Sequence, residues 1–130
     1  MSKKVLVVDD DPDVRLFSVN VLEENGYTPI EATDGEEGMK FVKKEKPDLI
    51  LLDVLMPKES GVRLYRNLKT DAALKKIPVI MLSGIARKSF LRSQKVLTQF
   101  GGAEIPEPDA YLEKPVEPEE LAKTIKKVIG

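Results

Sequence analysis

The chain has 130 residues, of which 42% are hydrophobic and 33% are charged, and its 21 Lys and Arg against 22 Asp and Glu leave a formal net charge of -1. A chain of this size and composition is expected to form one globular domain that buries a core without disulfides. It contains no Cys and no His, which excludes thiolate and histidine catalysis and the usual zinc sites. Any chemistry must therefore rest on carboxylates, hydroxyls and Lys, and any metal on oxygen ligands, as for Mg²⁺.

The charge balance also limits the partners and the compartment. A near-neutral chain has no general affinity for nucleic acid or anionic membranes, so we expect neither as a direct partner. The apolar run of residues 5–8 is interrupted by Asp9, so it is too short for a signal peptide or a membrane span. We therefore expect a cytoplasmic protein.

The first half of the chain alternates strand and helix patterns. The continuous apolar run 5–8 predicts a strand covered on both faces, as in a parallel sheet. A helix follows, opened by Asp11-Pro12 and closed by Gly26, because Asp caps helices, Pro suits the first helical position and Gly suits the end. A weaker strand fits 28–32, where Pro29 favours a sheet edge. The next helix is expected over 34–45.

The second half continues the alternation. Continuous apolar runs predict buried strands, and apolar residues at helical spacing predict the helices between them. The expected elements are strand 49–52, helix 60–69, strand 79–82, helix 87–100, a weaker strand 110–113 and helix 118–129. Five strands alternating with five helices predict a three-layer α/β domain over residues 1–130, with right-handed crossovers and no output domain.

Polar residues follow four of the predicted strands at the point where each strand ends. In an open parallel sheet the functional crevice lies beyond these carboxyl ends. Several carboxylates gathered there would repel one another, and a divalent cation relieves that repulsion. A Lys and a hydroxyl at the same edge suit the oxygens of a phosphoryl group. The residues are Asp9, Asp10, Asp11, Asp53, Ser83 and Lys114.

Each of these residues also has an ordinary structural explanation. Asp11 before Pro12 is the expected helix cap, and an isolated Asp53 would more often cap a helix than react. Ser83-Gly84 alone is typical of a turn, and a Lys-Pro pair of a surface loop. Capping does not explain why all of them occur together, each at a strand end, so the pattern favours a functional site.

The same residues carry a resemblance to a known family. The segments Val7-Val8-Asp9-Asp10-Asp11, Asp53-Val54-Leu55-Met56-Pro57-Lys58-Glu59-Ser60-Gly61, Ser83-Gly84 and Tyr111-Leu112-Glu113-Lys114-Pro115 resemble the receiver domain of two-component response regulators, over essentially the whole chain. The resemblance implies a flavodoxin-like, doubly wound sheet with strand order 2-1-3-4-5.

The resemblance also implies roles for individual residues. Asp53 would accept the phosphoryl group. Mg²⁺ would be bound by Asp10, by Asp53 and by the backbone carbonyl of Leu55, and by Asp9 through water. Lys114, next to a cis peptide bond in the family, and Ser83 would bind phosphoryl oxygens. A simple ion pair between Lys114 and Asp53 remains an alternative for the unphosphorylated protein.

Phosphorylation would act as a switch, not as turnover of an outside substrate. In the family, the residue at the position of Ser83 moves toward the phosphoryl group and the aromatic at the position of Tyr111 rotates inward, although Tyr111 alone also suits a half-buried strand. The face formed by the fourth helix, fifth strand and fifth helix then changes and binds a downstream effector. The phosphodonor would be a histidine kinase or a phosphotransfer protein, because this chain has no His.

Two other functions remain open from the sequence. A Mg²⁺-dependent phosphohydrolase could use Asp53 as its nucleophile, although position 55, where such enzymes place a second Asp, is Leu. A receiver that serves only as a scaffold is the other alternative. Leu55 and Ile85 are also apolar where many relatives are polar, and we expect them to exclude water and prolong the life of a phosphoryl group on Asp53.

Overall fold

The structure is a computed structural model that describes residues 2–54, 56, 60–84 and 106–130. It contains one parallel sheet of five strands in the order β2-β1-β3-β4-β5, which confirms the predicted fold and the place of Pro29 in an edge strand. The strands are β1 Lys4–Val8, β2 Thr28–Ala32, β3 Leu49–Asp53, β4 Val79–Ser83 and β5 Ala110–Glu113.

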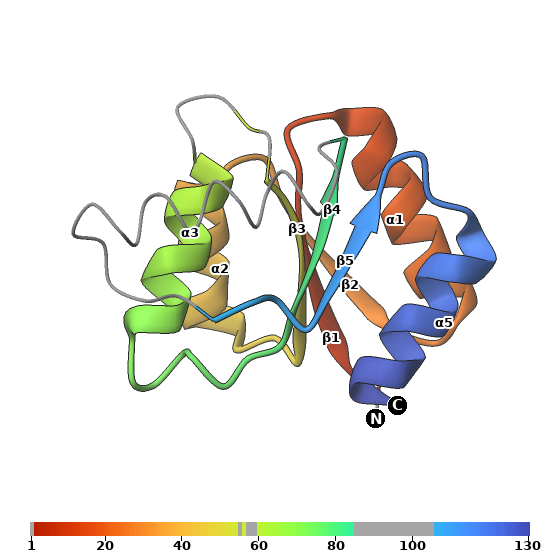
Figure 1. The fold of residues 1–130 in the computed structure, drawn as a ribbon. Helices are drawn as coiled ribbons and strands as arrows, with labels where there is room; N and C mark the ends of the chain where they lie inside the picture. The colour runs from red at the N-terminus through yellow and green to blue at the C-terminus, as the bar shows by residue number, and fades with distance from the viewer. Residues whose placement is uncertain (1, 55, 57–59, 85–105) are drawn as a thin grey trace.

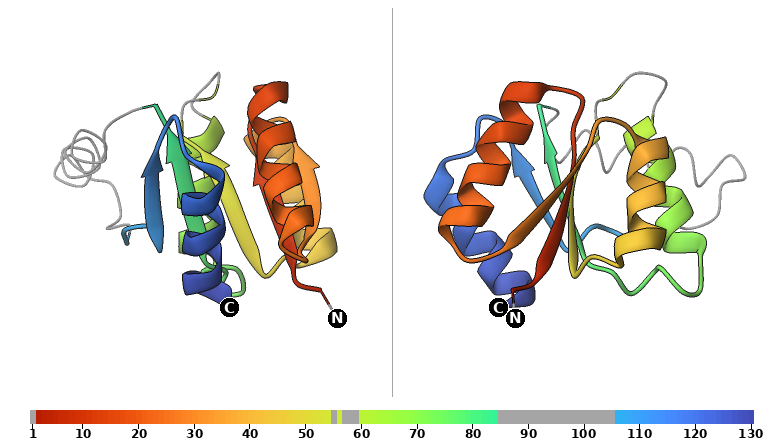
Figure 2. Two further views of the ribbon diagram at one scale, coloured as in Figure 1. Left: turned by 90° about the vertical axis from the view of Figure 1, so that its right-hand side faces the viewer. Right: turned by 180° about the vertical axis from the view of Figure 1, so that it is seen from behind.

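Helices cover both faces of this sheet. Figures 1 and 2 show α1 and α5 on one face and α2 and α3 on the other. Their bounds are α1 Pro12–Glu24, α2 Gly35–Glu45, α3 Ser60–Thr70 and α5 Pro118–Ile129. These agree with the predicted helices within one or two residues, and the predicted helix 87–100 lies outside the described residues. No helix of the described part is long and apolar enough to cross a membrane.

The sheet supplies both halves of the hydrophobic core. Successive side chains of a strand point to opposite faces, so a strand buried on both sides must be apolar at every position. Leu52 of β3 packs in the cluster under α2 and α3, whereas Leu51 packs in the cluster under α1 and α5. Both side chains are almost fully buried. This arrangement explains the continuous apolar runs from which the strands were predicted.

The first helix begins as its sequence predicts. The carboxylate of Asp11 accepts hydrogen bonds from the backbone amides of Asp13 at 2.8 Å and Val14 at 3.4 Å. These bonds satisfy two amides that have no partner within the helix. Gly26 follows the helix with a φ of +83°, in the left-handed region that glycine adopts without strain. Asp11 is therefore the cap of α1. The acidic cluster described below is formed by Asp9, Asp10 and Asp53 instead.

Candidate functional site

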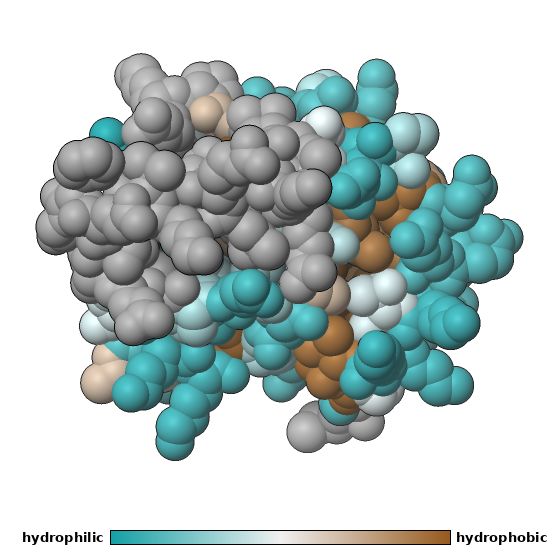
Figure 3. Space-filling model, in the orientation of Figure 1, coloured by the Kyte–Doolittle hydropathy of each residue, from teal (hydrophilic) through white to brown (hydrophobic). Residues whose placement is uncertain are grey.

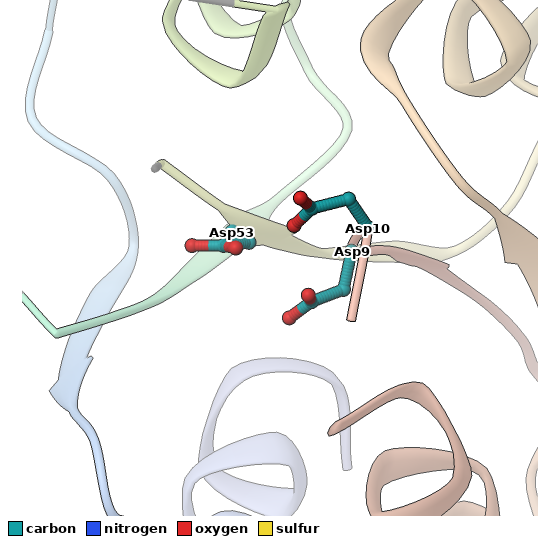
Figure 4. Close-up of side chains that lie close together, drawn as sticks. All are labelled: Asp9, Asp10 and Asp53. Carbon is teal, nitrogen blue, oxygen red and sulfur yellow. The ribbon is translucent and has the colours of Figure 1, made fainter. Parts of the chain in front are cut away.

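The pairing of β1 with β3 brings three carboxylates together. Val8 is level with Leu52, so Asp9, the next residue, lies beside Asp53 at the carboxyl end of the sheet. One carboxylate oxygen from each of Asp9, Asp10 and Asp53 lies within 4.8 Å of the other two. Figure 4 shows the three side chains converging from the ends of β1 and β3. The structure thus confirms the predicted grouping of these acids.

Two of the three carboxylates are buried, which makes their mutual repulsion costly. Asp9 is 2% exposed and Asp53 is 5% exposed, whereas Asp10 is exposed. The Nζ atom of Lys114 lies 3.2 Å from Oδ2 of Asp9 and 3.6 Å from Oδ2 of Asp53. The ammonium group of Lys114 offsets one unit of the charge of the three carboxylates, so by itself it does not remove their mutual repulsion. The predicted ion pair of Lys114 with Asp53 is present, with Asp9 as the nearer partner.

The donor set of this cluster fits a hard divalent cation. Carboxylate oxygens are the ligands that Mg²⁺ prefers, and Mg²⁺ keeps several of its waters when it binds. The exposed side chain of Asp10 leaves one side of the cluster open to water. Leu55, whose carbonyl was predicted as a further ligand, lies outside the described residues.

Strands β4 and β5 place Ser83 and Lys114 at the same edge. Ser83 is paired with Glu113, and the backbone amide of Lys114, the next residue, donates to the carbonyl of Ser83 at 2.8 Å. Ser83 is fully buried. The peptide bond between Lys114 and Pro115 is cis, as the resemblance implies. The hydroxyl and the ammonium group are therefore held on the two strands that continue the sheet beyond Asp53.

The two predicted switch residues are joined in this structure. Burial raises the pKa of Tyr111 above its usual value, a side-chain hydrogen bond with Ser83 opposes that rise, and the carboxylates of Glu113 and Asp53 add to it. Tyr111 is therefore a neutral phenol at physiological pH. The carboxylate of Asp53 is thus close enough to act on the phenol of Tyr111.

Gly61 has a direct steric reason to be glycine. A Cβ atom at this position would lie 2.2 Å from the backbone carbonyl oxygen of Asp53, closer than atoms can approach. The first turn of α3 thus crosses directly over the end of β3. This close approach explains why the motif that begins with Asp53 includes a glycine at the start of the next helix.

Sequence reasoning missed one residue that touches this site. Nη1 of Arg15, on α1, donates a hydrogen bond to the backbone carbonyl of Asp9 at 2.7 Å. Its Nε atom lies 3.5 Å from Oε1 of Glu31 on β2. A cation one helical turn beyond the Asp11 cap was the available signal, but charged residues are common on helix surfaces. The contact becomes evident only when α1 is packed on the sheet.

An apolar groove of about 430 Å³ opens beside Lys114. Its lining includes Val14 and Phe17 of α1 and Val116, which follows β5. Figure 3 shows hydrophobic surface on the side of the molecule where α1, β5 and α5 lie. A second groove, on the α2 and α3 side, includes charged residues such as Asp10 and Arg63 in its lining. The acidic cluster thus lies between two surfaces of different chemistry.

Comparison with known proteins places these features in a family. A family model described as the response regulator receiver domain matches residues 5–126. The chain is 35% identical over 129 residues to the phosphate regulon transcriptional regulatory protein PhoB of Escherichia coli, covering 99% of this chain and 52% of PhoB. It is 34% identical over 127 residues to the protein PilH of Pseudomonas aeruginosa, covering 98% of each.

Solved structures show the same likeness. The chemotaxis protein CheY4 of Vibrio cholerae matches with a TM-score of 0.81 and 29% identity, covering 98% of this chain and 99% of that one. The chain spans about half the length of PhoB, and it spans nearly all of PilH and CheY4. The likeness therefore extends over the whole sheet and its helices.

Proposed function

The chain belongs to the response regulator receiver family, and from that premise we propose that it is a phosphoacceptor signalling domain phosphorylated on Asp53. Receivers of this type are signalling proteins and not enzymes acting on outside substrates. The observation that carries the proposal is the contact of Lys114 with both buried carboxylates, Asp9 and Asp53. A buried acid with a cation beside it is prepared to accept an anionic group. We propose that the domain acts in the cytoplasm.

The transfer itself needs little chemistry from the protein beyond positioning and charge. A carboxylate oxygen of Asp53 attacks the phosphorus of the donor, and the bond from phosphorus to the donor's oxygen or nitrogen breaks, with its electron pair leaving on the donor. Lys114 binds one phosphoryl oxygen and Ser83 another. Asp10 and Asp53 would bind Mg²⁺ together with the carbonyl of Leu55, and Asp9 would bind it through water. Bound Mg²⁺ would neutralise charge that develops on the phosphoryl oxygens.

The burial of Asp9 and its two hydrogen bonds support its indirect role toward the metal. Oδ1 of Asp9 accepts from the amide of Asp11 at 2.9 Å, and Oδ2 accepts from Lys114 at 3.2 Å. Both oxygens are thus already engaged. Asp10, which is exposed, is the acid better placed to bind the cation directly.

The signal would leave the site through Ser83 and Tyr111. Phosphorylation replaces a carboxylate by a group of charge near -2 with three acceptor oxygens. The hydroxyl of Ser83 then turns from Tyr111 to a phosphoryl oxygen, and the ring of Tyr111 moves inward. The surface near β5 and α5 changes as a result and binds an effector protein. The fourth helix of the predicted face lies outside the described residues.

The donor would be a histidine kinase or a phosphotransfer protein, and a small acyl phosphate can replace it in the laboratory. We propose no direct partner of nucleic acid or membrane. Neither the phosphohydrolase nor the scaffold alternative is favoured by the family that the chain matches. The predicted effect of Leu55 and Ile85 on the lifetime of the phosphoryl group stays a prediction, because both lie outside the described residues.

Intact-mass analysis after incubation with acetyl phosphate and Mg²⁺ tests the proposal. The wild type is expected to gain the mass of one phosphoryl group, and Asp53→Asn is expected to gain none. Asp48→Asn is the matched control, since Asp48 and Asp53 lie at the two ends of β3, and Asp48 accepts from the amide of Lys4 at the opposite end of the sheet. An adduct that persists in Asp53→Asn would contradict the assignment of the phosphoacceptor.

A further inference from the structure

Neighbouring acids of the cluster are held in different ways. Asp9 is buried, and both of its carboxylate oxygens accept hydrogen bonds. The carboxylate of Asp10 is exposed and accepts no hydrogen bond from the described residues. A flexible carboxylate binds a cation less tightly than a preorganised one, because its freedom is lost on binding. Tight cation binding therefore requires a contact that orients Asp10 before the cation binds.

Arg15 contacts the peptide group that leads into Asp10. Its Nη1 atom donates to the carbonyl of Asp9 at 2.7 Å, and this carbonyl belongs to the planar peptide joining Asp9 to Asp10. On the other side, the amide of Asp9 donates to the carbonyl of Ala32 on β2 at 3.1 Å. Once the direction of the Asp9 carbonyl is fixed, the position of the Asp10 Cα atom is restricted as well.

The Arg15 side chain is itself held in place. Its Nε atom lies 3.5 Å from Oε1 of Glu31, and the side chain of Arg15 is only 17% exposed. A planar guanidinium group can hold two partners in fixed directions at once, and here it donates a hydrogen bond to a carbonyl and forms an ion pair with a carboxylate. The contact therefore joins the end of β1, the first turns of α1 and the edge strand β2.

We infer that Arg15 is a positioning residue, which preorganises Asp10 for a divalent cation by fixing the peptide between Asp9 and Asp10. The inference rests on the proposed function only in assigning the cation to the acidic cluster. It makes a prediction opposite in sign to that of simple electrostatics. As a mere positive charge beside three acids, Arg15 would weaken cation binding, and its removal would tighten it. As a positioning residue it strengthens binding.

The test is the affinity for Mg²⁺, measured by isothermal titration calorimetry without any phosphodonor. Arg15→Lys keeps the charge but loses the planar group that holds the carbonyl of Asp9 and the carboxylate of Glu31 together, and it is expected to bind Mg²⁺ a few-fold more weakly. Arg15→Met is expected to bind about tenfold more weakly, at the lower end of the losses seen when groups that orient metal ligands are removed. Thermal unfolding of the metal-free variants confirms that each is folded.

Arg63→Met is the matched control. Arg63 lines the same groove as Asp10, and none of the hydrogen bonds among the described residues joins it to Asp9. Its loss removes a cation near Asp10 without disturbing the peptide, so Mg²⁺ affinity is expected to stay unchanged or to rise slightly. If Arg15→Lys binds Mg²⁺ as tightly as the wild type, or Arg15→Met binds it more tightly, the positioning role is wrong.

Two further measurements separate this inference from the proposed function. Labelling by acetyl phosphate should slow in Arg15→Lys at low Mg²⁺ and recover to the wild-type rate at saturating Mg²⁺, which a general loss of structure would not allow. A rate that stays low at saturation contradicts the inference. Failure of the wild type to label at all would instead contradict the role of Asp53, and the calorimetric result on Arg15 would still stand by itself.

Discussion

At the amino ends of the strands Asp48, Asp109 and Lys69 bind backbone groups, whereas at the carboxyl ends Lys114 binds two carboxylates. Oδ2 of Asp48 accepts from the amide of Lys4, and Oδ1 of Asp109 accepts from the amide of Val79, both at 2.9 Å. Nζ of Lys69 donates to the carbonyl of Ile77 at 3.0 Å. Each of these charges binds a backbone group at or just before the start of a strand.

The opposite end of the sheet has the same residue types in a different arrangement. There the ammonium group of Lys114 lies between the carboxylates of Asp9 and Asp53. The single positive charge of Lys114 does not balance three carboxylates, and a divalent cation can relieve the repulsion that it leaves. Residue type alone therefore does not separate structural from functional charges. The partner of each charge does.

The largest effect on phosphorylation is expected from removing the ammonium group of Lys114 at the carboxyl end of the sheet. Lys114→Met should slow phosphorylation of Asp53 by about 10²- to 10³-fold, the usual loss for one electrostatic contact to a developing charge. The rate of the mass increase with acetyl phosphate and saturating Mg²⁺ measures it. Lys69→Met at the amino end serves as the control and should label at the wild-type rate. Equal slowing in both variants would remove the distinction between the two ends.

Removing a structural charge should lower the stability of the protein and leave its phosphorylation unchanged. Asp109→Ala leaves the amide of the fully buried Val79 without its partner, which costs about 1–3 kcal/mol. Urea unfolding measures this loss, while phosphorylation by acetyl phosphate should be unchanged. Asp109→Asn keeps an acceptor oxygen and should recover most of the stability. A loss of labelling in a folded Asp109→Ala protein would show that this residue also serves the site.

The alkaline stability of the protein should depend on Tyr65, which ties α3 to the segment before β5. Its hydroxyl donates to the carbonyl of Pro106 at 2.6 Å. Burial, followed by the carboxylates of Asp109 and Glu107, raises the pKa of Tyr65 above its usual value of 10.0. Above pH 10 the unfolded chain therefore loses a proton that the folded protein keeps, so stability falls as the pH rises.

Urea unfolding between pH 9 and pH 11 checks this, with Tyr65→Phe as the reference. The wild type should lose stability above pH 10 by up to about 1.4 kcal/mol per pH unit more than the Phe variant, which cannot ionise. At pH 7 the Phe variant should be the less stable of the two by about 1 kcal/mol, because it lacks the hydrogen bond. Parallel curves above pH 10 would contradict the assignment to Tyr65.

The smallest effect concerns a buried hydroxyl away from both ends of the sheet. Ser18 on α1 is fully buried, and its Oγ atom has no hydrogen-bond partner among the described residues. Ser18→Ala should raise the free energy of unfolding by less than about 1 kcal/mol, because Ala removes an unpaired polar atom and favours the helix. Ser83→Ala, at the proposed phosphorylation site, should instead slow labelling. A destabilised Ser18→Ala protein would point to an unseen partner for the hydroxyl.

Sequence patterns were sufficient for the architecture and for the main acidic cluster. The strands are buried on both faces, so each is a continuous apolar run, and a parallel sheet brings the ends of such runs to one edge. Asp9, Asp53, Ser83 and Lys114 could therefore be predicted from their positions after those runs. The cap at Asp11 was also predictable, since a helix start depends on residues next to it in the chain.

Other features were decided only by the tertiary structure. Arg15 binds the carbonyl of Asp9, and Tyr65 binds the carbonyl of Pro106. A backbone carbonyl is present at every residue, so no pattern in the sequence marks which one will be chosen. The pairing of Lys114 with Asp9 at a shorter distance than with Asp53 was likewise not predictable. The sequence by itself determined which side chains reach the edge of the sheet, because alternation and apolar runs are local properties. Which of them touch was decided by the pairing of the strands and the packing of helices on the sheet, because such contacts join residues far apart in the chain.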